Sequence, residues 1–153
     1  MPRFLATEAD TLDFGALLSR ELRPGLVIYL VGDLGTGKTT LARGILRGLG
    51  YAGRVKSPTF TLVEPYNVSR LHLYHFDFYR FDHPQELAHS GFRDYFGENA
   101  VCLIEWPEKA AGLPPPDLRI EMRMERAGRS IDLQAYTEAG RLCLTGLEDS
   151  NTA

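Results

Sequence analysis

The sequence predicts an α/β fold in which helices flank a central, mostly parallel β-sheet, and three observations point to it. Residues 26–31 form a continuous apolar run, and residues 101–104 form a second one. Unbroken apolar runs of this length are typical of strands that are buried on both faces, as in parallel sheets. Between the two runs, residues 38–49 carry apolar side chains at helical spacing. Buried strands that alternate with helices are the pattern of such a sheet.

The first elements of the chain follow from local signals. Residues 7–22 are predicted to form a helix, because Thr7 and Asp10 stand at the spacing of a capping box. The strand at residues 26–31 comes next, and a glycine-rich turn separates it from the helix at residues 38–49. The predicted order is therefore helix, buried strand, glycine loop and helix.

The rest of the chain is predicted to add antiparallel strands to this sheet. Residues 59–66 and 71–78 are rich in β-formers and flank a short polar turn, which predicts a hairpin. Residues 84–97 predict a short helix and a loop. Beyond a cluster of prolines, apolar and polar residues alternate, which predicts a half-exposed antiparallel meander over residues 117–147.

Composition indicates one globular domain over residues 1–153. Of these 153 residues 44% are hydrophobic and 24% are charged, with a net charge of −3. That balance argues against broad binding of nucleic acid, which needs a basic patch. Cys102 and Cys143 are isolated, which argues against a zinc site or a disulfide framework. No apolar leader or membrane-spanning run is present, so we expect a cytoplasmic protein without membrane contact.

A phosphate-binding loop follows the first buried strand. The segment GDLGTGKT at residues 32–39 matches the Walker A pattern G-x-x-x-x-G-K-[ST]. Glycines let backbone N–H groups converge on a phosphate at a helix N-terminus. Lys38 is expected to reach the β- and γ-phosphates, and the hydroxyl of Thr39 is expected to ligate Mg²⁺. With a strand before the loop and a helix after it, the prediction is a P-loop NTPase fold.

Two carboxylates are candidates for the acidic partner that a phosphate loop requires. Glu105 follows the second apolar run and should emerge beside the phosphates at the carboxyl edge of a central strand. Asp77 ends the second strand of the predicted hairpin, where GTPases place the aspartate on the magnesium side. The sequence leaves open which of the two binds the metal and which acts on the attacking water.

Weaker signals surround these residues. Thr59, after Ser57 and Pro58, is placed to sense a γ-phosphate as switch threonines do, although such turns are common. His75 shares a strand face with Asp77 and should lie near the site. Trp106, the only tryptophan, suits a partner contact or plain packing equally well.

Three classes of phosphate-loop protein can be compared on sequence alone. A GTPase needs an N-K-x-D motif. The motif is absent, because none of the three lysines, Lys38, Lys56 and Lys109, follows an asparagine. A small-molecule kinase shares the strand, loop and helix, but it normally adds an arginine-bearing lid. A nucleotide switch that binds ATP with little turnover shares them as well, so both alternatives remain open beside an ATPase.

Several segments together resemble the TsaE (YjeE) family, the bacterial ATPases of tRNA threonylcarbamoyladenosine biosynthesis. The resemblance rests on the motifs TLDFG, the phosphate loop, SPTFTLV, LYHFDFYR and IEWPE, which occur in family order between residues 7 and 110. Phe78 stands where leucine is expected, and Thr36 stands where alanine is common; neither change alters the chemistry. Residues beyond 110 add little to the resemblance.

The resemblance implies a cytoplasmic, Mg²⁺-dependent ATPase with low activity alone. Proteins of this family are needed to form threonylcarbamoyladenosine at position 37 of tRNAs that read codons beginning with A. They act with the proteins TsaB and TsaD, and hydrolysis of ATP resets the complex between turnovers. We therefore expect contact with tRNA only through these partners.

The resemblance also implies roles for individual residues. Catalysis would involve Lys38, Asp77 and Glu105, while Mg²⁺ would be held by Thr39 and Glu105. ATP would contact the following positions: Glu8, Thr11, Gly35, Thr36, Gly37, Lys38, Thr39, Thr40, Thr59 and Arg129. Within this set, Glu8 and Thr11 would approach the adenine, and Arg129 would reach the nucleotide from a turn.

Overall fold

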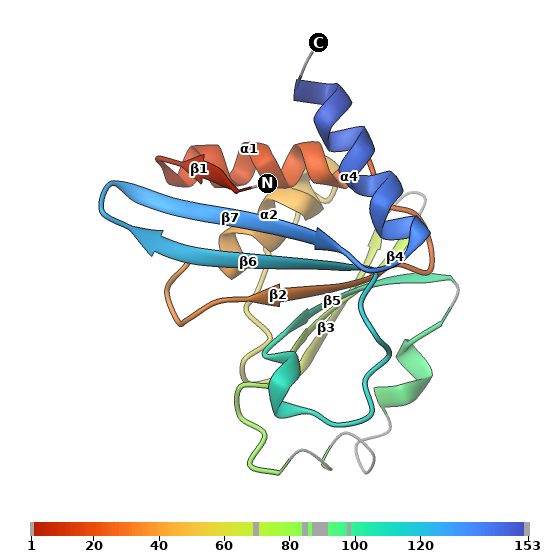
Figure 1. Ribbon diagram of the computed structural model, residues 1–153. Coiled ribbons are helices and arrows are strands. Elements are labelled where there is room, and N and C mark those ends of the chain that lie inside the picture. The colour runs from red at the N-terminus through yellow and green to blue at the C-terminus, as the bar shows by residue number, and fades with distance from the viewer. Residues whose placement is uncertain (1, 69–70, 84–85, 87–91, 98, 152–153) are drawn as a thin grey trace.

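The computed structural model describes residues 2–68, 71–83, 86, 92–97 and 99–151 of the chain (Figure 1). The strands are β1 (Arg3–Leu5), β2 (Val27–Val31), β3 (Val63–Val68), β4 (Leu71–Asp77), β5 (Ala100–Glu105), β6 (Leu118–Glu125) and β7 (Gly128–Ala135). The helices are α1 (Glu8–Ser19), α2 (Lys38–Gly48) and α4 (Glu138–Asn151), with short 3-10 helices η1 (Phe92–Tyr95) and η2 (Pro107–Lys109).

All seven strands form one sheet, in the order β1-β7-β6-β2-β5-β4-β3. The four central strands, β6, β2, β5 and β4, run parallel to one another. Antiparallel strands close both edges, since β3 pairs with β4, while β7 pairs with both β6 and β1. The predicted α/β fold, with a mostly parallel sheet and added antiparallel strands, is therefore confirmed.

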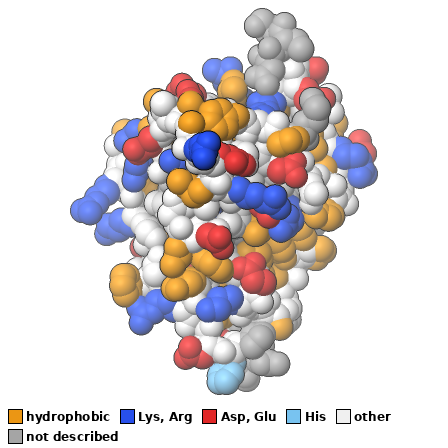
Figure 2. Space-filling view, turned by 60° about the vertical axis from the view of Figure 1, so that its left-hand side comes forward, with side chains coloured by type: hydrophobic (Ala, Val, Ile, Leu, Met, Phe, Trp, Pro, Cys, Tyr) orange, Lys and Arg blue, Asp and Glu red, His pale blue; other side chains and the backbone are white. Residues whose placement is uncertain are grey.

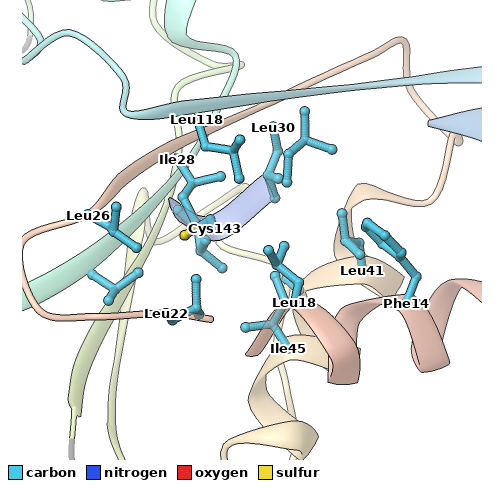
Figure 3. Close-up of a cluster of buried hydrophobic side chains, with 14 of the residues drawn as sticks. Phe14, Leu18, Leu22, Leu26, Ile28, Leu30, Leu41, Ile45, Leu118 and Cys143 are labelled. Atoms are coloured by element: carbon cyan, nitrogen blue, oxygen red, sulfur yellow. The ribbon is translucent and has the colours of Figure 1, made fainter. Parts of the chain in front are cut away.

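Helices α1, α2 and α4 lie together on one face of the sheet (Figure 1). The main core fills the space between them, where Leu18 of α1 and Ile45 of α2 meet Ile28 of β2 and Cys143 of α4 (Figure 3). A smaller aromatic cluster around Phe76 covers the opposite face. Burial on both faces explains why β5 reads as an unbroken apolar run.

The glycine loop connects β2 directly to α2, and this connection places the loop at the carboxyl edge of the parallel strands. β4 and β5 flank β2 on one side and end at Asp77 and Glu105. This arrangement is the P-loop NTPase fold that the phosphate-loop pattern predicted. Ligand sites of open α/β sheets occur at this edge.

The C-terminal meander is correct only in its first half. Strands β6 and β7 form as expected, but α4 (Glu138–Asn151) replaces the strands that were predicted up to residue 147. The hydroxyl of Thr137 accepts the N–H of Gly140 at 3.1 Å and so caps the helix. Among the α4 residues whose burial is described, Cys143 and Leu147 are the buried apolar ones and Leu144 is partly buried, so few positions could reveal the helix.

Two further elements differ from the prediction. β1 was not predicted, because three residues carry no periodic signal. The hairpin strand expected at 59–66 begins only at Val63, since residues 59–62 form a turn in which Leu62 adopts a φ of 68°. Half of the helix and loop expected at 84–97 lies outside the described residues, and the described half includes η1. In the described segments, no helix is long and apolar enough to span a membrane.

Candidate functional site

An open pocket of about 370 Å³ lies at the carboxyl ends of the central strands. The phosphate loop and the start of α2 form one wall, and the ends of β4 and β5 form another. The residues that line it are Glu8, Leu34, Gly35, Gly37, Lys38, Thr39, Thr40, Ser57, Thr59, Asp77, Glu105, Trp106 and Arg129. The pocket thus joins segments that are distant in sequence.

The glycine at the start of α2 is required by its backbone geometry. Gly37 has a φ of 105° in the left-handed region, which L-residues rarely adopt. A Cβ at Gly37 would also lie 2.2 Å from the guanidinium of Arg129. A helix N-terminus with unpaired N–H groups, reached through such a turn, favours an anion.

Lys38 is buried at this helix start, with only 6% of its surface exposed. Its Nζ donates to the carbonyl of Gly32, lies 3.5 Å from that of Asp33, and sits 4.2 Å from the centroid of the Trp106 ring. Burial lowers the pKa of Lys38, and the charges of Glu105 and Asp77 oppose this shift. The site thus holds a cation close to two carboxylates.

Asp77 is held by donors on both oxygens. Its Oδ1 accepts the backbone N–H of Tyr79 at 2.8 Å, and its Oδ2 accepts the hydroxyl of Thr59 at 3.2 Å. The hydroxyls of Thr59 and Ser57 lie 2.8 Å apart. Burial raises the pKa of Asp77, and the nearby charge of Glu105 raises it further, while the N–H of Tyr79 lowers it.

Glu105 stands beside Asp77, because the two are partners in the parallel register of β4 and β5. The residue is 3% exposed, and its Oε2 lies 2.5 Å from Nε2 of His75. The expectation that His75 lies near the site is confirmed by this contact. His72, on the other face of the same strand, is exposed and bonds to Asn67.

Trp106 forms a wall of the pocket directly after β5. The residue has a left-handed φ of 57°, which turns the chain sharply after Glu105. Its ring contacts the ammonium group of Lys38 and also packs against the ring of Tyr79, with the two centroids 5.0 Å apart. The structure therefore shows a packing role for Trp106 within the site.

Glu8 and Arg129 reach the pocket from elements outside the loop. Glu8 begins α1 and lies 3.5 Å from Arg43 of α2. Arg129 extends from β7, and its guanidinium donates to the carbonyl of Thr36 at 3.3 Å. Its Nε is buried and has no hydrogen-bond partner within the described part of the chain.

Two predicted nucleotide contacts do not line this pocket. Thr11 is fully buried in α1, where its hydroxyl lies 3.4 Å from the carbonyl of Thr7. The hydroxyl of Thr36 donates to the carbonyl of Asp33 at 3.0 Å, and the residue lines a second cavity instead. Both side chains are thus bonded to the backbone of their own segment.

Some pocket residues were missed by the sequence analysis. Leu34, 65% exposed, stands in the phosphate loop, and Ser57 bonds to Thr59. Ser57 was visible as part of the Ser-Pro-Thr turn, but turn chemistry alone did not single it out. The pattern places no constraint on Leu34, so no sequence signal identified it.

Together these groups offer a helix N-terminus, a cation, hydroxyls and two adjacent carboxylates around one open pocket. A helix N-terminus and a lysine bind phosphates, while hydroxyl and carboxylate oxygens suit a hard divalent cation. The arrangement fits a nucleotide phosphate with its metal.

Comparisons with known proteins agree with this geometry. The sequence model of the family described as "Threonylcarbamoyl adenosine biosynthesis protein TsaE" matches residues 5–131. The protein named tRNA threonylcarbamoyladenosine biosynthesis protein TsaE in Haemophilus influenzae is 44% identical over 147 residues, which cover 92% of this chain and 93% of that protein. Its namesake in Bacillus subtilis is 40% identical over 131 residues, 86% of this chain and 81% of that protein.

A solved structure shows the same fold. The crystal structure of YdiB from Bacillus subtilis superimposes with a TM-score of 0.77 at 30% sequence identity, covering 99% of this chain and 95% of YdiB. The matched range of the family model includes the phosphate loop, Asp77, Glu105 and Arg129. On these grounds the chain belongs to the TsaE family.

Proposed function

We propose that this chain is a Mg²⁺-dependent ATPase that acts in forming threonylcarbamoyladenosine at position 37 of tRNAs that read codons beginning with A. One observation carries the ATPase proposal: the phosphate loop and the carboxylates of Asp77 and Glu105 line a single pocket. The pathway rests on the names of the TsaE relatives in Haemophilus influenzae and Bacillus subtilis.

The phosphate loop and Lys38 would bind the phosphates. Backbone N–H groups between Gly35 and Thr40 supply donors at the N-terminus of α2, where the helix dipole favours an anion. Lys38 adds a cation at the base of the loop. Because its Nζ is now bonded to the carbonyl of Gly32, Lys38 must exchange this partner for a phosphate oxygen.

Thr39 and Glu105 are the residues that we propose to hold Mg²⁺. Both line the pocket, and both offer the oxygen donors that this cation prefers. Mg²⁺ is commonly bound through one or two protein oxygens together with substrate phosphates, so two side chains are a sufficient set. When bound, Mg²⁺ neutralises charge that develops on the phosphates during transfer.

Asp77 is proposed to orient the attacking water. Donors from Tyr79 and Thr59 fix its carboxylate, which lines the pocket beside Glu105. A carboxylate held in this way can accept a hydrogen bond from water and align it with the γ-phosphate. Thr59 shares this carboxylate, so the Ser-Pro-Thr turn is connected to the site of hydrolysis.

Glu8 is proposed to contact the nucleotide on the adenine side, and Arg129 is proposed to contact it beside the phosphate loop. Glu8 starts α1 at the rim of the pocket, and Arg129 covers the phosphate loop at Thr36 and Gly37. For Thr36 the proposal is limited to its backbone, because its hydroxyl is bonded to Asp33. Thr11, which lies one turn after Glu8 and is buried inside α1, would not contact the nucleotide directly but would help to place Glu8.

TsaB and TsaD are the proposed partners, and tRNA would be reached through them in the cytoplasm. Acidic and basic side chains are interspersed on the face shown in Figure 2, which fits the net charge of −3. A protein of this charge is poorly suited to hold tRNA alone. We propose that turnover is slow without the partners and that hydrolysis resets their complex.

Release of labelled γ-phosphate from ATP tests this proposal. We expect slow Mg²⁺-dependent release by the chain alone and faster release when TsaB and TsaD are added. Transfer of the label to a small acceptor, with no effect of the partners, would instead identify a kinase. ATP-dependent binding to the partners without any release would identify a nucleotide switch.

A further inference from the structure

A histidine contacts one of the two carboxylates from inside the protein. Nε2 of His75 lies 2.5 Å from Oε2 of Glu105, and the side chains are 0% and 4% exposed. The pocket residues include Glu105 but not His75. His75 therefore stands behind Glu105, where it can bond to the carboxylate without touching a ligand.

Strand register explains why these two residues meet. β4 and β5 run in parallel, with His75 opposite Leu103 and Asp77 opposite Glu105. Alternate residues of a strand share one face, so all four side chains point to the face that carries α2. Glu105 lies two residues beyond Leu103, the partner of His75. The imidazole of His75 therefore reaches diagonally across the strand pair to contact Glu105.

The other ring nitrogen indicates which group donates. Nδ1 of His75 is buried and has no hydrogen-bond partner among the described residues. A buried N–H without an acceptor is costly, which places the ring proton on Nε2. Nε2 then donates to Oε2 of Glu105, and this bond fixes both the tautomer of His75 and the rotation of the carboxylate.

The second oxygen of Glu105 is left for another partner. Over the described segments, His75 is the residue whose side chain bonds to this carboxylate, through Oε2. Oε1 has no hydrogen bond to these residues, although Glu105 lines the pocket. When one carboxylate oxygen is hydrogen-bonded from the protein interior and the other is open to a pocket, the carboxylate is pre-oriented toward a ligand.

We propose that His75 is a positioning residue that holds Glu105 in the orientation needed to bind Mg²⁺ beside a bound nucleotide. The inference rests on the proposed function, because it concerns Glu105 as a metal ligand. A purely structural histidine would also be buried, but its replacement would change stability without changing metal affinity selectively. These two roles therefore differ in a measurable way.

A matched pair of variants separates them. The amide nitrogen of glutamine reaches the place of Nε2, whereas that of asparagine falls at the place of Nδ1. We expect His75→Gln to keep the donor to Glu105 and His75→Asn to lose it. Both variants put a polar amide at the same buried position, so a general effect of burial should be similar in the two.

Binding of Mn²⁺, measured by electron paramagnetic resonance with ADP present, is the readout. We expect His75→Asn to weaken Mn²⁺ binding by about 10- to 100-fold, the usual effect of removing such a partner. His75→Gln should stay within about threefold of the original protein, as expected when the donor is kept. Binding of ADP without metal should be unchanged in both variants. Equal Mn²⁺ affinity in the two variants would overturn the proposal.

A measurement on the unaltered chain covers the case in which a variant fails to fold. Nitrogen-15 chemical shifts of the histidine rings should show His75 with its proton on Nε2, and a proton on Nδ1 would overturn the proposal. Neither readout requires turnover. Absence of ATP hydrolysis with normal Mn²⁺ binding would therefore count against the proposed function but not against the role of His75.

Discussion

The ammonium group of Lys38 lies 4.2 Å from the centroid of the Trp106 ring. Behind Trp106 the ring of Tyr79 packs at 5.0 Å, and Lys109 lies 4.9 Å from that ring and donates to the carbonyl of Tyr79 at 2.6 Å. Two of the three lysines of the chain thus flank one pair of aromatic rings. The only tryptophan consequently contacts the cation that we propose to bind phosphate.

Binding of ATP should therefore change the fluorescence of Trp106. A phosphate that attracts Lys38 removes a cation from the indole face, and this changes the surroundings of the emitting ring. In Lys38→Ala we expect a strongly reduced response at ATP concentrations that saturate the original chain. Loss of charge-assisted hydrogen bonds of about 1.5–3 kcal/mol each corresponds to roughly 10- to 150-fold weaker binding.

Lys109→Ala is the control for this titration. Lys109 stands behind Tyr79 and does not line the pocket, so its removal should leave the ATP affinity within about twofold. An ATP response that persists unchanged in Lys38→Ala would contradict the proposed role of Lys38.

Removal of Glu105 should separate binding from turnover. In Glu105→Ala the phosphate loop and Lys38 remain, so the affinity for ATP measured without metal should be retained. Mg²⁺-dependent phosphate release should fall by about 100-fold or more, because metal stabilisation of the transferring group is worth several kcal/mol.

Glu108→Ala is the matched control, since Glu108 is an exposed acid three residues further on that does not line this pocket. Phosphate release by this variant should equal that of the original chain. If Glu105→Ala lost ATP affinity as completely as Lys38→Ala, the separate roles of the two residues would be wrong.

Part of this site was predictable because its residues follow local rules. The Walker A pattern locates Lys38 and Thr39 without any knowledge of the fold. Glu105 and Asp77 each end a strand, and the carboxyl ends of parallel strands meet at one edge, so their proximity followed from the fold class. Alternation of side chains along a strand placed His75, two residues before Asp77, on the same face.

Other features depend on long-range packing that the sequence does not encode locally. Arg129 reaches the phosphate loop only because β6 and β7 form a hairpin that passes beside it. The hydroxyl of Thr36 turns to Asp33, although its place in the motif suggested the nucleotide. The sequence pattern predicted strands where α4 forms, because few apolar side chains in its described part, chiefly Cys143 and Leu147, are buried.

Asp77→Asn should stabilise the protein while it removes turnover. Burial raises the pKa of Asp77 above its ordinary value of 3.8, so the native state disfavours the carboxylate. Between 3.8 and the raised value the native chain keeps a proton that the unfolded chain has released. Stability from this group therefore falls as the pH rises through that window.

Asparagine keeps the contacts of Asp77 without the buried charge. Its carbonyl accepts the N–H of Tyr79, and its amide donates to the hydroxyl of Thr59, which can serve as an acceptor. Thermal unfolding of both proteins at pH 4 and pH 8 is the measurement. We expect the advantage of Asp77→Asn to be larger at pH 8; an equal difference at both values would contradict the raised pKa.

Gly44→Ala should destabilise the protein although alanine favours helices. A Cβ at Gly44 would lie 2.5 Å from the carbonyl oxygen of Leu12 and 2.9 Å from its Cα. These are backbone atoms of α1, so α1 and α2 must separate. The higher helix propensity of alanine stabilises the helix by about 1 kcal/mol, whereas forced overpacking destabilises the protein by about 1–3 kcal/mol. We expect a net loss of about 1 kcal/mol, or roughly 2–4 °C in Tm.

The same substitution should weaken nucleotide binding, because α1 begins at Glu8 and α2 begins at Lys38, and both residues line the pocket. Gly97→Ala is the control: a Cβ there meets no atom of the described residues within 4 Å, so Tm and ATP affinity should be unchanged. Thermal unfolding and ATP titration of the two variants provide the comparison. A higher Tm for Gly44→Ala would show that the helices adjust freely, and that the close contact of α1 with α2 does not fix the distance between Glu8 and the phosphate loop.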